Sequence, residues 1–367
     1  MACWRLRKIL GVLSVLVIFA FAGLIGLTGS PVLNVTTANA QTAGNVPGNW
    51  SGSMSDAEVW RAVRKGIKGR VSIPDKNAGQ LVQPDGESWR AVKNGPVSQF
   101  GGWLLLAMVV LLGLFYAFRG RIMIDGGPSG QTIERFSSLE RLVHWLTATS
   151  FIVLALTGLN LLYGRYILMP VLGQEIFAAL TYYGKLFHNY IAFSFMVGVV
   201  LMFLLWVRDN FPNRHDVKWI LAAGGLFTKG SHPPSKRFNA GQKFIFWWVV
   251  LAGTSMALSG LTLMFPFMLE PMAKFATMVN LTGIGGGGEL SQLQQTQVAS
   301  IWHALVGLVF IAVIIGHIYI GSVGMEGAIE AVSTGQVDRK WAQDHHNLWV
   351  EEMDAEGAEQ AEAQPAE

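Results

Sequence analysis

Five long apolar stretches restrict most strongly how this chain can fold. They lie at residues 101–118, 142–163, 187–207, 244–268 and 301–323, and none contains Asp, Glu, Lys or Arg. Each is close to the roughly 20 residues that a helix needs to cross the hydrocarbon core of a bilayer. Only 14% of all residues are charged, whereas soluble domains carry about 25%. The sequence therefore predicts an all-α integral membrane protein.

Charge and cysteine content exclude other classes of protein. The chain has 27 Lys and Arg against 24 Asp and Glu, and the excess comes from Arg5, Arg7 and Lys8. This balance gives no electrostatic case for a nucleic-acid partner. The single cysteine is Cys3. The rest of the chain can therefore supply no thiolate zinc site, no iron–sulfur ligand and no cysteine attachment for haem.

The N-terminal part is predicted to be exported. Residues 1–40 read as a cleaved signal peptide, with a basic start, an apolar run and Ala38-Asn39-Ala40 before Gln41. An uncleaved membrane anchor is the alternative, because the apolar run is long for a signal. Residues 41–99 are polar and repeat WRAVRKG as WRAVKNG 29 residues later. These repeats either contact membrane lipid or a partner, or belong to a solvated linker. Residues 100–120 are predicted to form an extra transmembrane helix.

Lys and Arg in the loops predict the orientation. Loops 119–141 and 208–243 hold four and seven basic residues, whereas the loops on the other side hold only Arg165, Lys185 and Lys274. The basic loops are therefore expected in the cytoplasm of a bacterial cell, with the N-terminal region periplasmic and the C-terminus cytoplasmic. Residues 326–350 are predicted to be a cytoplasmic segment. Residues 351–367, with seven acidic residues and no basic one, are predicted to be a disordered tail.

Four of the eight histidines, His144, His188, His303 and His317, lie in or at the ends of the apolar stretches. Ionisable residues inside a membrane are rare and usually functional. His303 and His317 are 14 residues apart, about four helical turns, so they share one face at depths about 21 Å apart. The predicted helix directions then give an outer pair, His188 with His303, and an inner pair, His144 with His317.

Two histidines at one depth on different helices can bind haem iron from both sides. Such an iron passes electrons and does not bind oxygen. The pattern therefore predicts two b haems, one above the other, with these four histidines as axial ligands. A proton relay and ordinary packing are the alternatives. A relay usually recruits acidic residues within the spans, and these spans have none.

Several sequence motifs resemble one known family. They are ERLVHW at 140–145, LFH at 186–188, RFNAGQK at 237–243, the spacing of His303 and His317, and GQVDRKWAQDHHNLW at 335–349. Together they resemble the gamma, or cytochrome b, subunit of respiratory formate dehydrogenase, over about 133–349. Single motifs also suit hydrogenase cytochrome b subunits. The resemblance implies a four-helix dihaem cytochrome b bundle at 133–325, here with one extra N-terminal transmembrane helix.

The resemblance also implies a function as a membrane anchor without catalytic residues of its own. An iron–sulfur beta subunit would deliver electrons from a molybdenum or tungsten alpha subunit that oxidises formate. Menaquinone or ubiquinone would be reduced beside His317, in a pocket that maps onto Asn239, Gly241 and Gln242. Asn239 could equally cap a helix. The remaining alternatives are an anchor of a hydrogenase or related reductase, and a haem-free transporter or structural anchor.

Overall fold

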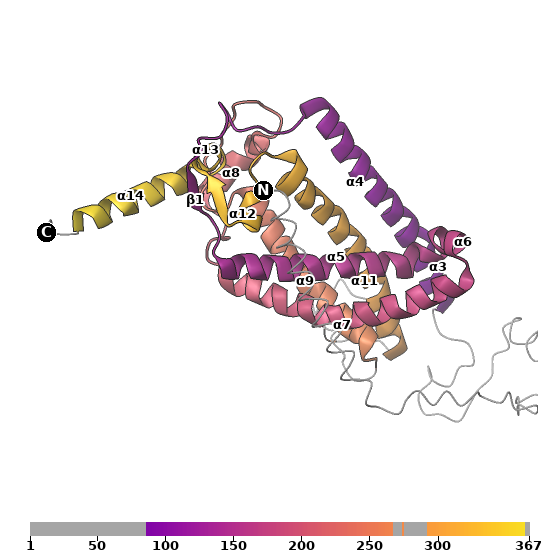
Figure 1. Cartoon of the computed structure of the whole chain (residues 1–367). Coiled ribbons are helices and arrows are strands. Elements are labelled where there is room, and N and C mark those ends of the chain that lie inside the picture. The colour runs from indigo at the N-terminus through magenta and orange to yellow at the C-terminus, as the bar shows by residue number, and fades with distance from the viewer. Residues whose placement is uncertain (1–85, 267–273, 275–291, 364–367) are drawn as a thin grey trace, which may run out of the picture. The chain divides into compact units, whose positions relative to one another are not determined.

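The computed structural model describes residues 86–266, 274 and 292–363 (Figure 1). The predicted signal peptide 1–40 and the first repeat copy, at 60–66, lie outside the described residues. The described elements, in chain order, are α3 (Gly86–Val92), η1 (Lys93–Val97), α4 (Ser98–Arg119), β1 (Thr132–Glu134), α5 (Ser138–Ile167), α6 (Met169–Leu172), α7 (Gln174–Trp206), α8 (Arg214–Leu221), η2 (Ala223–Gly225), α9 (Ala240–Met264), α11 (Gln292–Tyr319), η3 (Ile320–Gly324), α12 (Glu330–Ser333), β2 (Gln336–Asp338), α13 (Arg339–His345) and α14 (Asn347–Ala363).

Among the described residues, five helices are long and apolar enough to cross a membrane, and they are built on α4, α5, α7, α9 and α11. This confirms the prediction of a membrane protein with five spans. In hydrocarbon every backbone polar group must be satisfied within the protein, which a helix achieves along its own axis. The middle of each helix can therefore carry apolar side chains on all sides, because its backbone polar groups are already paired.

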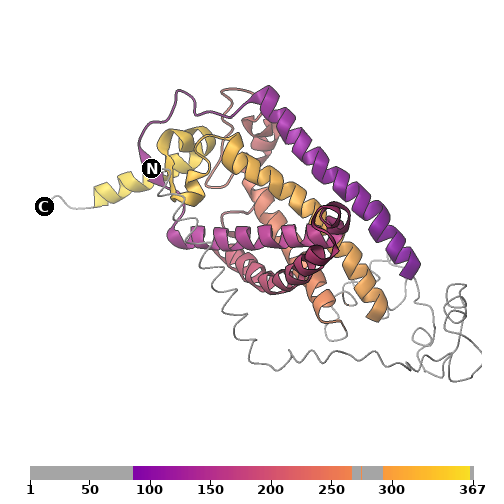
Figure 2. The same ribbon diagram turned by 45° about the vertical axis from the view of Figure 1, so that its right-hand side comes forward.

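Four of these helices form two packed pairs. α5 and α7 lie side by side as an antiparallel hairpin closed by the short α6, and α9 packs against α11. α7 also contacts α9, which joins the two pairs into one bundle (Figures 1 and 2). Gly198 on α7 makes the hairpin tight, because a Cβ there would lie 2.4 Å from the Thr147 hydroxyl oxygen of α5.

Glu140 fastens three helices at one end of the bundle, which we call the Glu140 end. Its side chain completes a capping box with Ser137 at the start of α5. It also accepts hydrogen bonds from Trp206 Nε1 at the end of α7, at 2.7 Å, and from Arg237 just before α9, at 2.6 Å. Trp145 Nε1 donates to the Val332 carbonyl, beyond the end of α11. The starts of α5 and α9 and the ends of α7 and α11 therefore meet at this end.

A small sheet, which the sequence patterns do not predict, lies beyond the Glu140 end. β1 pairs antiparallel with β2, with Ile133 opposite Val337. Beside it, the buried Arg135 guanidinium donates to His346 Nε2 and lies over the rings of Trp341 and Trp349. Burial lowers the pKa of Arg135 to about 9, so it remains a cation at neutral pH. The contacts tie residues 335–350 to the segment that precedes α5.

The extra N-terminal span, α4, lies outside the four-helix bundle and packs against α11. Gly101 allows this approach, because a Cβ there would lie 2.2 Å from Leu308 Cδ1. Tyr163 on α5 donates its hydroxyl hydrogen bond to the Ser98 carbonyl at 2.7 Å. The extra helix is thus attached to two helices of the bundle, while most of its large side chains remain exposed.

The acidic tail differs from its prediction as a disordered segment. α14 continues through Ala363, so residues 351–363 are helical. The helix is rich in Ala and Glu, which have high helix propensity. Ion pairs from Lys236 to Glu352 and from Arg339 to Asp354 also hold its first turns. Local propensity and these anchors outweigh the repulsion between the acidic side chains.

Candidate functional site

His188 on α7 and His303 on α11 face one another. Their ring centroids are 6.2 Å apart, and the ring planes are inclined at 63°. Glycines of the neighbouring helices make room for both rings. A Cβ at Gly158 would lie 3.4 Å from His188 Cε1, and one at Gly260 would lie 3.3 Å from His303 Cε1. Any larger side chain at these glycines would press against the histidines.

Two hydroxyl groups fix how these rings are oriented. Thr157 Oγ1 lies 2.8 Å from His188 Nδ1, and Ser259 Oγ lies 2.9 Å from His303 Nδ1. Each hydroxyl donates its only proton to a carbonyl one turn back, of Val153 and Ser255 respectively. In this arrangement each hydroxyl accepts from an imidazole protonated on Nδ1. That tautomer leaves the lone pair of Nε2 available for a metal.

His144 on α5 and His317 on α11 form the second pair. Their ring centroids are 6.4 Å apart, and the planes are inclined at 60°. His144 Nδ1 is buried and has no hydrogen-bond partner among the described residues. A buried polar nitrogen without a partner is costly. His144 therefore has hydrogen-bonding capacity that the described residues do not satisfy.

The spacing of both pairs fits a metal ion between the rings. The nitrogen of a metal-bound imidazole lies about 2.0–2.1 Å from the metal, and the centre of the ring lies about 1 Å further away. Two imidazoles on opposite sides of one metal therefore have ring centroids about 6 Å apart. The observed values are 6.2 and 6.4 Å. Histidine imidazoles also form the ligand set that b-type haem iron uses. The four residues thus fit the group that the sequence pattern predicts.

An aromatic cluster lies between the two pairs. Phe310 is on α11, seven residues from His303 and seven from His317, so all three share one face of the helix. Its ring is 4.7 Å from that of Phe151, and Phe195 and Trp248 complete the cluster. Phe310 is almost completely buried. The cluster separates the two sites with rigid, close-packed rings.

The predicted quinone residues lie at the start of α9, at the Glu140 end. Asn239 and Gln242 form a reciprocal capping box, in which each side-chain oxygen accepts from the other's backbone N–H. The helix-capping alternative is therefore present in the structure. A Cβ at Gly241 would lie 2.8 Å from Trp219 Cη2, so the space beside this glycine is occupied by an indole. Within the described residues, no hydrogen bond or ring contact joins this stretch to His317.

Four residues important to this geometry were not selected from the sequence: Thr157, Ser259, Phe310 and Trp219. Thr and Ser within apolar helices commonly bond back to their own helix, so nothing local marks Thr157 or Ser259 as partners of histidine. Phe310 carried a usable signal, because it stands midway between two in-phase histidines. Trp219 lies outside the spans and contacts Gly241 only through the folding of the loop.

Replacing Thr157 with valine is expected to weaken haem binding while leaving His188 in place. The substitution keeps the shape but removes the oxygen that accepts from His188 Nδ1. Loss of such a supporting partner typically lowers affinity about 10–100-fold. Haem titration of haem-depleted protein in detergent would measure this. Thr149→Val is the matched control, since Thr149 bonds back to α5 in the same way. Equal affinity in both variants would contradict the assigned role.

Comparison with known proteins places this bundle in a family. Residues 135–334, more than half of the chain, match the family model for prokaryotic cytochrome b561. The cytochrome b556(fdo) subunit of formate dehydrogenase from Escherichia coli K12 is 26% identical over 227 residues, which cover 60% of this chain and 93% of that subunit.

Two further relatives have the same character. The nitrate-inducible formate dehydrogenase cytochrome b556(Fdn) subunit of Escherichia coli K12 is 23% identical over 63% of this chain and 96% of its own. The formate dehydrogenase cytochrome b556 subunit of Haemophilus influenzae is 20% identical over 60% of this chain and 83% of its own. The family match of this chain confirms the prediction of a cytochrome b and speaks against the alternative of a haem-free membrane protein. The chain belongs to the prokaryotic cytochrome b561 family, whose members are membrane-embedded helical bundles that carry haem b.

Proposed function

We propose that the chain is the membrane cytochrome b subunit of a formate dehydrogenase and passes electrons through two b haems to quinone. The observation that carries this proposal is the pair of facing histidine sets, at 6.2 and 6.4 Å, that share the single helix α11. The relatives reported above support the choice of formate dehydrogenase over a hydrogenase. A b haem with two axial histidines supplies one-electron transfer without oxygen binding.

The four histidines act as ligands in this proposal. His188 and His303 would hold the haem that receives electrons, and Thr157 and Ser259, which contact the Nδ1 atoms, would keep the two rings oriented for it. His144 and His317 hold the second haem at the Glu140 end. Phe310 and its neighbours keep water from the space between the two sites.

The quinone site is proposed at the start of α9. Asn239 and Gln242 use their side-chain oxygens in the capping box, so each still has an amide NH₂ group to donate to a quinone carbonyl. Trp219 provides a flat apolar wall beside Gly241. The site lies at the same end of the bundle as His317, because Glu140 joins the residues before α9 to the start of α5.

The proposed partners follow from the proposed direction of electron flow, and the proposed orientation follows from the distribution of Lys and Arg. An iron–sulfur subunit would dock where His188 and His303 lie and would connect to a molybdenum or tungsten subunit that oxidises formate. In the proposed bacterial inner membrane, the distribution of Lys and Arg favours an orientation with the Glu140 end in the cytoplasm. The N-terminal region would then be periplasmic.

Purification of the intact complex tests the proposed function. The complex solubilised in mild detergent is expected to show b-type absorption bands that formate reduces and added quinone reoxidises. Hydrogen gas in place of formate should leave the bands oxidised. Reduction by hydrogen and not by formate would instead support the hydrogenase alternative, and a preparation without b-type bands would refute both.

Variants that preserve the helix cap can isolate the quinone contacts. Asn239→Ser keeps an oxygen that caps α9 but removes the amide donor, and Gln242→Glu does the same for its partner. Each is expected to slow reoxidation by quinone about two- to tenfold, the value of one hydrogen bond. Stopped-flow measurement of haem reoxidation provides the rate.

The matched control for these variants is Asn213→Ser. Asn213 caps α8 with an equivalent capping box, in which Asp216 is the second member. It should leave both haem content and reoxidation unchanged. Wild-type reoxidation in both the Asn239 and Gln242 variants would move the quinone site elsewhere.

A further inference from the structure

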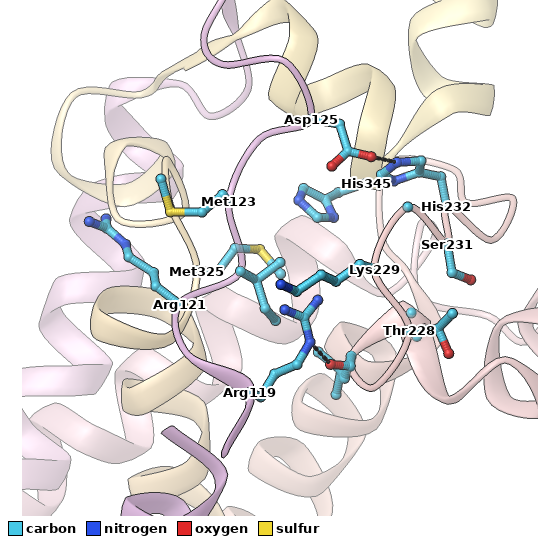
Figure 3. Close-up of a pocket in the computed structure, with 15 residues that line it drawn as sticks. Arg119, Arg121, Met123, Asp125, Thr228, Lys229, Ser231, His232, Met325 and His345 are labelled. Atoms are coloured by element: carbon cyan, nitrogen blue, oxygen red, sulfur yellow. Dashed lines mark hydrogen bonds and ion pairs between the residues drawn. The ribbon is translucent and has the colours of Figure 1, made fainter. Parts of the chain in front are cut away.

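A cationic cavity lies at the end of α4, outside the histidine sites. Its volume is about 190 Å³. Its lining comes from the segment after α4, the loop of residues 224–232, Met325 and His345 (Figure 3). Pockets that enclose a whole small ligand measure roughly 300–1,000 Å³. This cavity is therefore of a size for one chemical group and not for a complete organic ligand.

The charge inside the cavity is positive and uncompensated. Arg119, Arg121 and Lys229 all line it. Arg119 Nε donates to the Leu226 carbonyl at 2.7 Å, which fixes the guanidinium. Figure 3 shows the heads of Arg119 and Lys229 directed toward the middle of the cavity. Within the described ranges, no carboxylate pairs with either of them.

The single carboxylate of the lining is already engaged. Asp125 Oδ2 lies 2.7 Å from His232 Nε2, and this hydrogen bond lowers the pKa of Asp125. Burial lowers the pKa of His345 to about 4, so it adds no charge at neutral pH. Two cations that converge without a counterion indicate an anionic ligand.

The surroundings of the cavity are apolar. Phe227, from the same loop as Lys229, packs edge-on against Phe115 of α4 at 5.7 Å. Phe227 is 70% exposed, and Phe118, one residue before Arg119, is 88% exposed. Leu221 at the end of α8 is exposed as well. Apolar side chains at the end of a span, next to cations, match the boundary between acyl chains and headgroups.

We propose that this cavity binds the phosphate of an anionic phospholipid headgroup, with the acyl chains lying over Phe118 and Phe227. A phosphate diester presents oxygens that accept from both Arg119 and Lys229. The neighbouring exposed rings favour an amphiphile over a free phosphate ion. Arg119 and Arg121 precede the region that matches the cytochrome family, so the site depends on the extra span of this chain.

Lipid binding to the full chain in detergent tests the proposal. The protein is first delipidated, and each lipid is then added separately. Native mass spectrometry is expected to detect one bound phosphatidylglycerol and no bound phosphatidylcholine. Lys229→Gln should lower the phosphatidylglycerol affinity about fivefold, the contribution of one basic residue near a membrane surface. Lys229→Arg should retain binding. An unchanged b-type spectrum in each variant verifies the fold.

A matched control separates this site from general surface charge. Lys218 is exposed on the nearby α8 and does not line the cavity, so Lys218→Gln should bind like the wild type. An equal loss in both Gln variants, or equal binding of phosphatidylcholine, would overturn the proposal. Displacement of the lipid by an equal concentration of inorganic phosphate would show that the cavity recognises free phosphate instead of a lipid.

Discussion

Replacing His188 with alanine is expected to remove one of two b haems and to stop reduction of the other by formate. His188 is one of two rings that face each other at 6.2 Å, and alanine would leave His303 as the only histidine of that pair to hold a haem. The second site keeps both of its histidines, His144 and His317. The pyridine haemochrome assay should therefore find half of the wild-type haem. Dithionite should still reduce the haem that remains.

His215→Ala is the matched control, because His215 lies on α8, outside the spans. It should keep both haems and full reduction by formate. If His188→Ala lost both haems while the protein remained monodisperse in size-exclusion chromatography, the two pairs would not be independent sites. Retention of both haems would show that His188 is not a ligand.

Replacing His317 with alanine is expected to remove the other haem and to abolish quinone reduction. In this variant formate should still reduce the remaining haem, because His188 and His303 are untouched. Loss of a ligand that binds only the folded state also lowers stability, by about 2.7 kcal/mol for a ligand at a hundredfold of its Kd. The thermal midpoint should therefore fall as well.

Comparison of the two alanine variants gives the order of the sites. Formate should reduce the haem left in His317→Ala but not the one left in His188→Ala. The reverse pattern would mean that electrons arrive at the Glu140 end, and the proposed direction of transfer would then be wrong. Rapid mixing with formate, followed in the b-type bands, distinguishes these outcomes.

Much of this arrangement follows from the sequence because a membrane limits the choices. Apolar length predicts the helices, and the 14-residue spacing with alternating helix direction predicts which histidines share a depth. The structure brings the same residues into two ring pairs. Arithmetic along a helix suffices here, since every ligand candidate lies within or at the end of a regular element.

The remainder depends on contacts between segments that are distant in sequence. Ser259 reaches His303 only because α9 packs on α11. β1 and β2 are three residues each and lie about 200 residues apart, so neither shows a periodic pattern long enough to detect. The helical tail reflects ion pairs to Lys236 and Arg339, which composition alone does not reveal.

The shared helix α11 imposes a constraint on how the chain can change in length. Insertion of one residue between His303 and His317 would rotate one of them by about 100° and shift it by about 1.5 Å along the axis. One ring would then lose its partner on α5 or α7. The connections outside the bundle do not set this rotation. A change in their length would leave the two rings of α11 in phase, whereas the interval within α11 must stay fixed.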